Sequence, residues 1–175
     1  MIFACRGYAD GMSMQHGYDV EVEWTGAGDE GTATYRSYSR QHVVRIDGLP
    51  DIQGSADRTF HGDADRHNPE QLLVTALAQC HMLSYLHQAA KNGIVVTAYE
   101  DTAHGTMETE GQGGRFTEVT LRPVIAITDA ARAQEAMDAH LQASANCFIA
   151  QSVAFPVHHE PTIVVDGEVV AGGAA

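Results

Sequence analysis

The stretch NPEQLLVTALAQCHMLSYLHQAAKNG, residues 68–93, predicts one long helix whose two ends are marked by local signals. Asn68 is a favourable N-cap residue, and Pro69 suits the first helical position because an N–H there would have no partner. Glu70 places a negative charge at the positive end of the helix dipole. Asn92 and the glycine that follows it provide a C-terminal stop. We therefore expect a helix that begins after residue 68 and ends near residue 92.

The body of this helix is apolar on nearly every side. Its apolar residues are Leu72, Leu73, Val74, Ala76, Leu77, Ala78, Met82, Leu83, Leu86, Ala89 and Ala90. Such a distribution predicts an enclosed helix rather than one with a solvated face. Gln79, His81 and Gln88 interrupt the apolar run, so the segment is unsuited to spanning a membrane. Cys80 lies in the middle of the helix, and a second cysteine, Cys147, follows near a second predicted helix.

Length and charge predict one acidic domain over residues 18–175. A chain of 175 residues can bury roughly 70% of its unfolded surface, which is enough for a sizeable core. The formal net charge of −13 argues against binding to nucleic acids or anionic membranes, because phosphate contacts need a basic face. Three cysteines make no dense disulfide framework, and no basic segment precedes a long apolar one. We therefore expect a cytoplasmic protein with reduced thiols.

Residues 1–17 show no hydrophobic period and are interpreted as an N-terminal tail. Cys5 in this tail is interpreted as incidental to function. Met12 and Met14 are alternative start positions.

Alternating side chains predict strands on both sides of the long helix. Tyr18, Val20, Val22 and Trp24 alternate with acidic residues, as in a half-buried strand. After a glycine-rich turn at 26–31, further strands are expected at 32–38, 42–46, 94–107, 116–127 and 162–165. A hairpin across residues 111–114 joins the strands at 94–107 and 116–127. Asp129 can cap a second helix from residue 130 to about 143. The elements together predict an α+β fold.

Several segments together resemble the OsmC/Ohr family of thiol-dependent hydroperoxide reductases. They are NPEQLL with a cysteine ten positions after its glutamate, a distal cysteine near a second helix, and the flanking YRSYSRQH, FHGDADRHNPE and CFIAQSVAFPVHHEP. The resemblance covers roughly residues 18–165. It implies antiparallel sheets around a buried central helix, in an intertwined homodimer with active sites at the interface.

By position, the resemblance implies that Cys80 is the peroxidatic cysteine, Cys147 the resolving cysteine, and Glu70 the carboxylate that anchors a catalytic arginine. A thiolate is the nucleophile, and a free cysteine with a pKa of about 8.5 needs a cationic neighbour to ionise at neutral pH. Attack on the O–O bond yields a sulfenic acid, which a second thiol condenses to a disulfide. An arginine can stabilise both the thiolate and the departing alkoxide, and a carboxylate can hold its fork.

Two arginines are the main candidates for that role. Arg40 in YSRQH is favoured, because the organic-hydroperoxide branch of the family draws its arginine from this early hairpin. Arg58 in DRTFHG is the alternative, because the OsmC branch uses an arginine in the loop before the helix, and Arg36 is a third candidate. Glu70 and Cys80 are ten helical steps apart, about 15 Å. We therefore expect Glu70 to act across the dimer interface, beside Cys80 of the partner subunit.

The histidines do not predict a metal site. The neighbouring pairs Cys80-His81 and His158-His159 point their side chains in different directions, and no CxxC or HxxxH spacing occurs. His81 either tunes the Cys80 thiolate or is a hydrogen-bonded structural residue, and the structural interpretation is favoured. No cofactor is expected.

The expected function is reduction of organic hydroperoxides to alcohols through a Cys80 sulfenic acid and a Cys80–Cys147 disulfide. A dithiol or a lipoylated protein would serve as reductant. The alternative is a redox sensor or ligand-binding protein of the same fold that does not turn over. Many peroxides consumed per subunit would favour the enzyme, and a single equivalent would favour the sensor.

Overall fold

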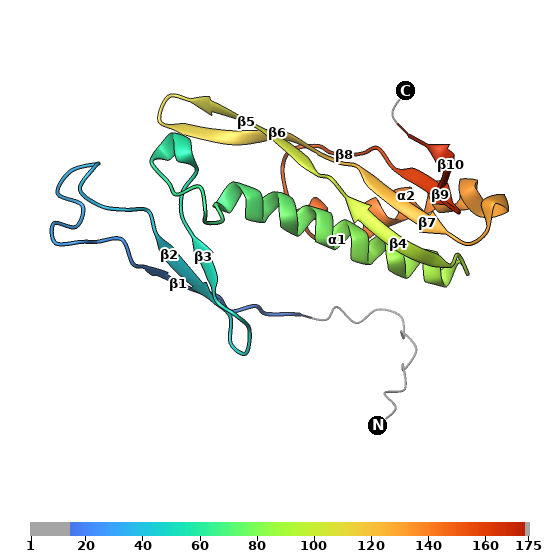
Figure 1. Cartoon of the computed structure of the whole chain (residues 1–175), viewed down its shortest axis with the longest axis horizontal. Helices are drawn as coiled ribbons and strands as arrows, with labels where there is room; N and C mark the ends of the chain where they lie inside the picture. The colour runs from blue at the N-terminus through green and yellow to red at the C-terminus, as the bar shows by residue number, and fades with distance from the viewer. Residues whose placement is uncertain (1–14, 174–175) are drawn as a thin grey trace. The chain divides into compact units, whose positions relative to one another are not determined.

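The computed structural model describes residues 15–173, and the chain divides after His67 into two compact units. The first unit holds a three-stranded antiparallel sheet of order β1-β2-β3 and a short 3-10 helix. Its elements are β1 Glu21–Trp24, β2 His42–Arg45, β3 Ile52–Gly54 and η1 Arg58–Phe60. The second unit holds both α-helices and the remaining strands (Figure 1). The expected single domain remains a prediction.

Helix α1, Pro69–Lys91, has the predicted ends. The Asn68 side chain accepts a hydrogen bond from the Gln71 amide at 2.8 Å, and the Gln71 side chain accepts one from the Asn68 amide at 3.3 Å. This reciprocal pair is a capping box, which satisfies two amides that have no partner within the helix. Gly93, just beyond the helix, has φ of 70°, a left-handed conformation that glycine adopts without steric cost.

Only one side of α1 is buried within the single chain. Its buried residues are Leu77, His81, Tyr85, Gln88 and Ala89, which recur at spacings of one to four residues. Leu83 is 63% exposed. The enclosure on every side that the apolar sequence predicts is therefore absent from the single chain, although the helix itself is where it was expected.

The second unit contains two sheets. Their strands are β4 Val96–Asp101, β5 His104–Glu110, β6 Gly113–Leu121, β7 Pro123–Ile127, β8 Val157–His159, β9 Thr162–Val165 and β10 Glu168–Gly172. One sheet has the order β10-β9-β7-β4 and the other has the order β5-β6-β8. The predicted hairpin across the glycine-rich turn is confirmed, because Glu110 pairs with Gly113 at the ends of β5 and β6.

Two strand pairs correct the expectation of purely antiparallel sheets. Strand β6 pairs with β8 in parallel, and β7 pairs with β9 in parallel. Parallel neighbours need a long crossover connection. Helix α2, Ala133–Asn146, lies in the connection that follows β7, together with the 3-10 helices η2 Ala130–Arg132 and η3 Ala150–Ser152.

The single strands expected at 94–107 and 116–127 are wrong, because each is two strands in different sheets. Strand β4 ends at Asp101, and its carboxylate accepts a hydrogen bond from the Arg122 amide at 2.8 Å. Arg122 is also the residue that separates β6 from β7. The Asp101 side chain thus satisfies the backbone amide at the point where the chain passes from one sheet to the other.

The strand expected at 32–38 is also wrong, because this segment is a series of turns. The Ser37 hydroxyl donates to the Gly31 carbonyl at 2.8 Å and accepts from the Thr34 amide at 3.0 Å. Hydrogen bonds between hydroxyls and the nearby backbone compete with strand ladders. The second expected helix is correctly placed, but Asp129 caps η2, which precedes α2, by accepting from the Ala131 amide.

The hydrophobic core belongs to the second unit. One cluster packs side chains of α1, α2 and the four-stranded sheet, including Tyr85, Ala136 and Ile125. A second cluster has Leu77, Val119 and Leu121 at its centre. In the described residues of the first unit, Val43 is the one buried hydrophobic residue.

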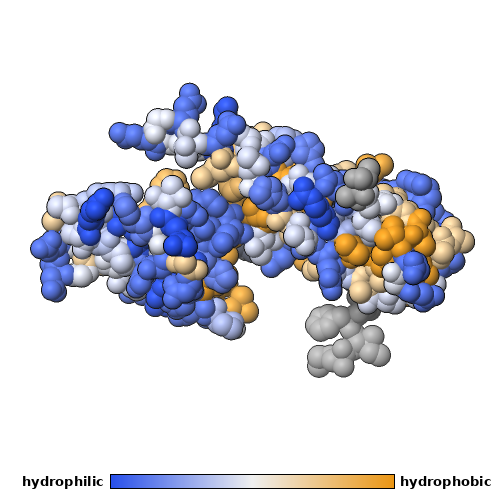
Figure 2. Space-filling model, turned by 45° about the horizontal axis from the view of Figure 1, so that its top comes forward, coloured by the Kyte–Doolittle hydropathy of each residue, from blue (hydrophilic) through white to orange (hydrophobic). Residues whose placement is uncertain are grey.

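Apolar side chains also reach the surface among polar ones (Figure 2). They include Val20, Val22 and Trp24 of the first unit, all of which are exposed. Among residues 15–173, no helix is both long and apolar enough to cross a membrane.

Candidate functional site

Helices α1 and α2 bring the two predicted thiols together. Cys80 lies at the middle of α1, and Cys147 is the residue that caps the C-terminus of α2. Cys80 is close enough to Cys147 to raise the pKa of the Cys147 thiol, and both are free thiols. Cys5, the third cysteine, lies outside the described residues. The structure thus places two free cysteines near each other inside the second unit.

The two thiols differ in exposure and in acidity. Cys147 is 1% exposed, whereas Cys80 is half-buried. Burial, followed by the interaction with Cys80, raises the pKa of Cys147 to about 11 against the opposing effect of the Ala150 and Ile149 backbone amides. Cys147 is therefore a neutral thiol at pH 7, and Cys80 is the member of the pair that a solute can reach.

Glu70 carries a buried oxygen that lacks a hydrogen-bond partner among the described residues. It occupies the first turn of α1, and its Oε2 atom is the unpaired one. Leaving a buried carboxylate oxygen unpaired costs free energy, so such a group is suited to receive a cation. Glu70 and Cys80 lie in the same helix, ten residues apart, so about 15 Å of helix separates them within one chain.

Arg40 lies in the first unit, beside the turns at 32–38. Its Nη1 donates to the Tyr38 carbonyl at 2.6 Å and its Nη2 to the Tyr35 carbonyl at 2.7 Å. Its guanidinium carbon lies 4.4 Å from the Tyr35 ring centroid and 4.2 Å from that of Tyr38. A guanidinium has five N–H donors, so this arrangement holds the group while leaving donors available.

The other candidate arginines also belong to the first unit. Arg58 lies in η1 and is exposed, and Arg36 lies in the turns that precede Arg40. Cys80, Cys147 and Glu70 belong to the second unit. The structure therefore brings the two thiols together, while the partnership of an arginine with Cys80 or Glu70 stays a prediction.

His81 is a buried, hydrogen-bonded histidine, which confirms the structural interpretation. Its Nε2 lies 3.0 Å from Nδ1 of His140 in α2, and its ring centroid is 4.1 Å from that of His159 in β8. The His140 ring also stacks on Tyr85, with centroids 4.1 Å apart. Burial, followed by the neighbouring histidines, lowers the pKa of His81 and of His140 to about 3. The rings of His140 and His159 therefore both lie next to the ring of His81. His81 and His140 stay uncharged at neutral pH.

The sequence interpretation missed His140, His159 and Tyr85 as parts of one cluster. A signal for His140 was present, because it falls within the alanines of α2 that recur every three or four residues: Ala133, Ala136, Ala139 and Ala143. His81 Nδ1, His140 Nε2 and His159 Nε2 are buried without a partner among the described residues. Buried polar atoms of this kind are usually satisfied by ordered water.

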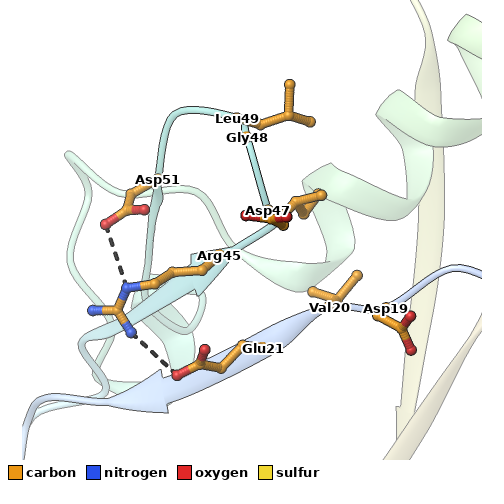
Figure 3. Close-up of a pocket in the computed structure, with 9 residues that line it drawn as sticks. Asp19, Val20, Glu21, Arg45, Asp47, Gly48, Leu49 and Asp51 are labelled. Atoms are coloured by element: carbon orange, nitrogen blue, oxygen red, sulfur yellow. Dashed lines mark ion pairs between the residues drawn. The ribbon is translucent and has the colours of Figure 1, made fainter.

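The first unit also contains an open pocket rich in carboxylates (Figure 3). Arg45 is the basic residue in its lining, and it forms ion pairs with Glu21 at 3.5 Å and Asp51 at 3.6 Å, and also with Glu23 at 2.6 Å. These ion pairs are solvent-exposed and contribute little to stability. Across residues 15–173, no group of three histidine, cysteine or acidic side chains could hold a metal ion.

Comparison with known proteins identifies similar sequences and folds. The family model for OsmC-like proteins matches residues 62–162. An OsmC-like protein of unknown function from Vibrio cholerae is 32% identical, with a TM-score of 0.75 and coverage of 84% of this chain and 99% of its own. No curated protein sequence matches.

Two more distant structures share the fold alone. An organic hydroperoxide resistance protein OsmC from Legionella pneumophila is 19% identical, with a TM-score of 0.64. An organic hydroperoxide resistance protein from Elizabethkingia anophelis is also 19% identical, with a TM-score of 0.61. In both cases the match covers 87% of this chain and 100% of the other.

Proposed function

The chain belongs to the OsmC-like protein family, and we propose that it is a thiol-dependent peroxidase that reduces organic hydroperoxides to alcohols. The placement of a half-buried free thiol, Cys80, beside a buried free thiol, Cys147, carries this proposal. A half-buried thiol can meet a peroxide, and a second thiol in contact with it can remove the resulting sulfenic acid before further oxidation.

In the first step, the Cys80 thiolate attacks the terminal oxygen of the hydroperoxide. The O–O bond breaks, the alkoxide leaves with the electron pair and takes a proton to become the alcohol, and Cys80 becomes a sulfenic acid. A guanidinium beside Cys80 would stabilise both the thiolate and the departing alkoxide. Arg40 suits this role because two of its five N–H donors are used by carbonyls and the rest remain available.

In the second step, Cys147 gives up its proton and attacks the sulfur of Cys80. The S–O bond breaks, the oxygen leaves as water, and a Cys80–Cys147 disulfide forms. A dithiol, free or carried by a lipoylated protein, then reduces this disulfide by exchange. The cycle requires a reducing compartment, in keeping with a cytoplasmic protein.

The proposed active unit is an intertwined homodimer with its sites at the interface. Two observations support a second copy. Glu70 has a buried oxygen without a partner among the described residues, and the first unit leaves Val20, Val22 and Trp24 exposed. In the dimer, Glu70 would anchor the arginine that lies beside Cys80 of the partner subunit. Glu70 and Cys80 could then serve one site although they lie far apart along α1 of a single chain.

The proposed substrate class rests on the family and its members from Legionella pneumophila and Elizabethkingia anophelis, which are organic hydroperoxide resistance proteins. The test is the number of equivalents of cumene hydroperoxide consumed per subunit with excess dithiol. We expect many equivalents, with one alcohol formed per peroxide. Consumption that stops at one equivalent would contradict the enzyme and favour a redox sensor of the same fold.

A further inference from the structure

Helix α2 packs its small side chains inward. Four alanines are buried on its inner face, and the remaining buried residue of the helix is His140. Packed helices are held in place by ridges of side chains that enter grooves of the neighbour. A face made of alanine methyl groups has shallow ridges. It therefore gives little resistance when the helix slides along its neighbour.

His140 is the large side chain of α2 that is almost completely buried, whereas Met137 is partly buried against the same core cluster. Its ring stacks on Tyr85 at a centroid distance of 4.1 Å and on His81 at 5.3 Å, with interplanar angles of 22° and 16°. His81 and Tyr85 are four residues apart in α1, so they lie one above the other on the same face. His140 therefore contacts two successive turns of α1, and its 3.0 Å hydrogen bond to His81 gives that position a polar specificity.

The same two helices carry the thiols. Cys80 immediately precedes His81 in α1, and Cys147 lies two helical turns beyond His140, at the end of α2. A slip of α2 by one turn would be about 5.4 Å. A disulfide requires Cβ atoms about 3.5–4.5 Å apart, so such a slip would separate Cys147 from Cys80. It would also leave the His81 and His140 nitrogens of the hydrogen bond unpaired in the interior.

We infer that His140, seated against His81 and Tyr85, is a positioning residue that sets the axial register of α2 on α1 and thereby holds Cys147 within reach of Cys80. The inference deepens the proposed function and rests on it for its biological meaning. A buried polar pair that specifies register is an established use of such pairs in helical proteins.

The test is the equilibrium between the thiol pair and glutathione at pH 7.5. Two reduced cysteines and one glutathione disulfide give the Cys80–Cys147 disulfide and two glutathione molecules, so the equilibrium constant measures the effective concentration of one thiol at the other. For His140→Ala we expect this constant to fall at least tenfold, which is a shift of about 30 mV toward a less negative potential. His140→Phe keeps a ring against the two turns of α1. Its equilibrium constant should therefore fall less than that of His140→Ala.

Ser84→Ala is the matched control. It removes a weak 3.5 Å hydrogen bond from Ser84 to the Asn146 carbonyl in the same helix interface, and the constant should change less than threefold. An unchanged constant in a folded His140→Ala protein would overturn the inference. If His140→Ala does not fold, the test is made with His140→Phe. Loss of the hydrogen bond alone should still lower the constant at least threefold. An unchanged constant in His140→Phe would overturn the inference.

The equilibrium uses no peroxide, so it separates the inference from the proposed function. A protein that consumes no hydroperoxide but shows the expected shift in His140→Ala refutes the peroxidase and supports the role of His140. A peroxidase whose thiol equilibrium is insensitive to His140→Ala supports the function and refutes the role of His140.

Discussion

The thiols of Cys80 in α1 and Cys147 at the end of α2 are neighbours, with Cys80 half-buried and Cys147 almost completely buried. This asymmetry divides the chemistry between them. In the proposed mechanism, the thiol that a peroxide can reach is oxidised first, and the buried thiol is protected from direct oxidation but lies near the product.

Substitution of each thiol should therefore stop the cycle at a different point. Cys80→Ser should abolish peroxide consumption even in the first turnover. Cys147→Ser should consume one equivalent, form a Cys80 sulfenic acid and recycle poorly. Rapid-mixing peroxide assays, with a sulfenic acid trap read by mass spectrometry, distinguish the two. Undiminished turnover by Cys80→Ser would rule out the mechanism.

The surroundings of the thiols predict a preference for apolar peroxides. Leu83 follows Cys80 by one helical turn and Phe148 follows Cys147 directly, and they are 63% and 80% exposed. Each buried methylene of a substrate should contribute about 0.8 kcal/mol to binding. We expect kcat/KM for cumene or fatty-acid hydroperoxides to exceed that for hydrogen peroxide by at least tenfold. Phe148→Ser should reduce this ratio, and the exposed Val169→Ser, in strand β10, serves as its control.

A higher kcat/KM for hydrogen peroxide than for cumene hydroperoxide would contradict this preference. A ratio that Phe148→Ser and Val169→Ser reduce equally would show that Phe148 does not contact the substrate.

The unpaired Glu70 oxygen predicts a site shared between subunits. In a hybrid dimer with Glu70→Ala on one chain and Cys80→Ser on the other, one shared site loses both groups and the other keeps both. About half of the wild-type activity should survive. The hybrid is prepared with two affinity tags and assayed beside wild-type dimers that carry the same tags. An inactive hybrid would place both groups in the same subunit.

The buried histidines predict a loss of stability in acid. Burial holds the pKa of His81 and of His140 at about 3, below the value of 6.5 for an exposed histidine. Between these values the unfolded chain binds protons that the folded chain does not, so folding becomes less favourable as the pH falls from 6.5 toward 3. The free energy of unfolding falls by about 1.4 kcal/mol per pH unit for each histidine that stays neutral in the folded chain.

Urea unfolding at several pH values measures this fall in stability. His140→Gln should reduce the slope of unfolding free energy against pH by about 1 kcal/mol per pH unit. His87→Gln changes an exposed histidine of the same helix and should leave the slope unchanged. Equal slopes for wild type and both variants would show that His140 does not control acid stability.

Local interactions explain what was predictable from the amino-acid sequence. The capping box of Asn68 and Gln71 and the left-handed Gly93 involve residues within a few positions of one another, so the ends of α1 are encoded locally. The hairpin of β5 and β6 is equally local. The family, with its two cysteines and Glu70, was recognisable for a similar reason, because its motifs are short segments.

Contacts between distant segments decided the rest. The Asp101 carboxylate accepts a hydrogen bond from the Arg122 amide at the point where two expected strands are each divided into two. The meeting of Cys80 with Cys147, and of His81 with His140, depends on how α2 packs on α1. The alternation of side chains predicts which residues face inward, but the partner that each residue meets depends on the packing of whole helices and sheets.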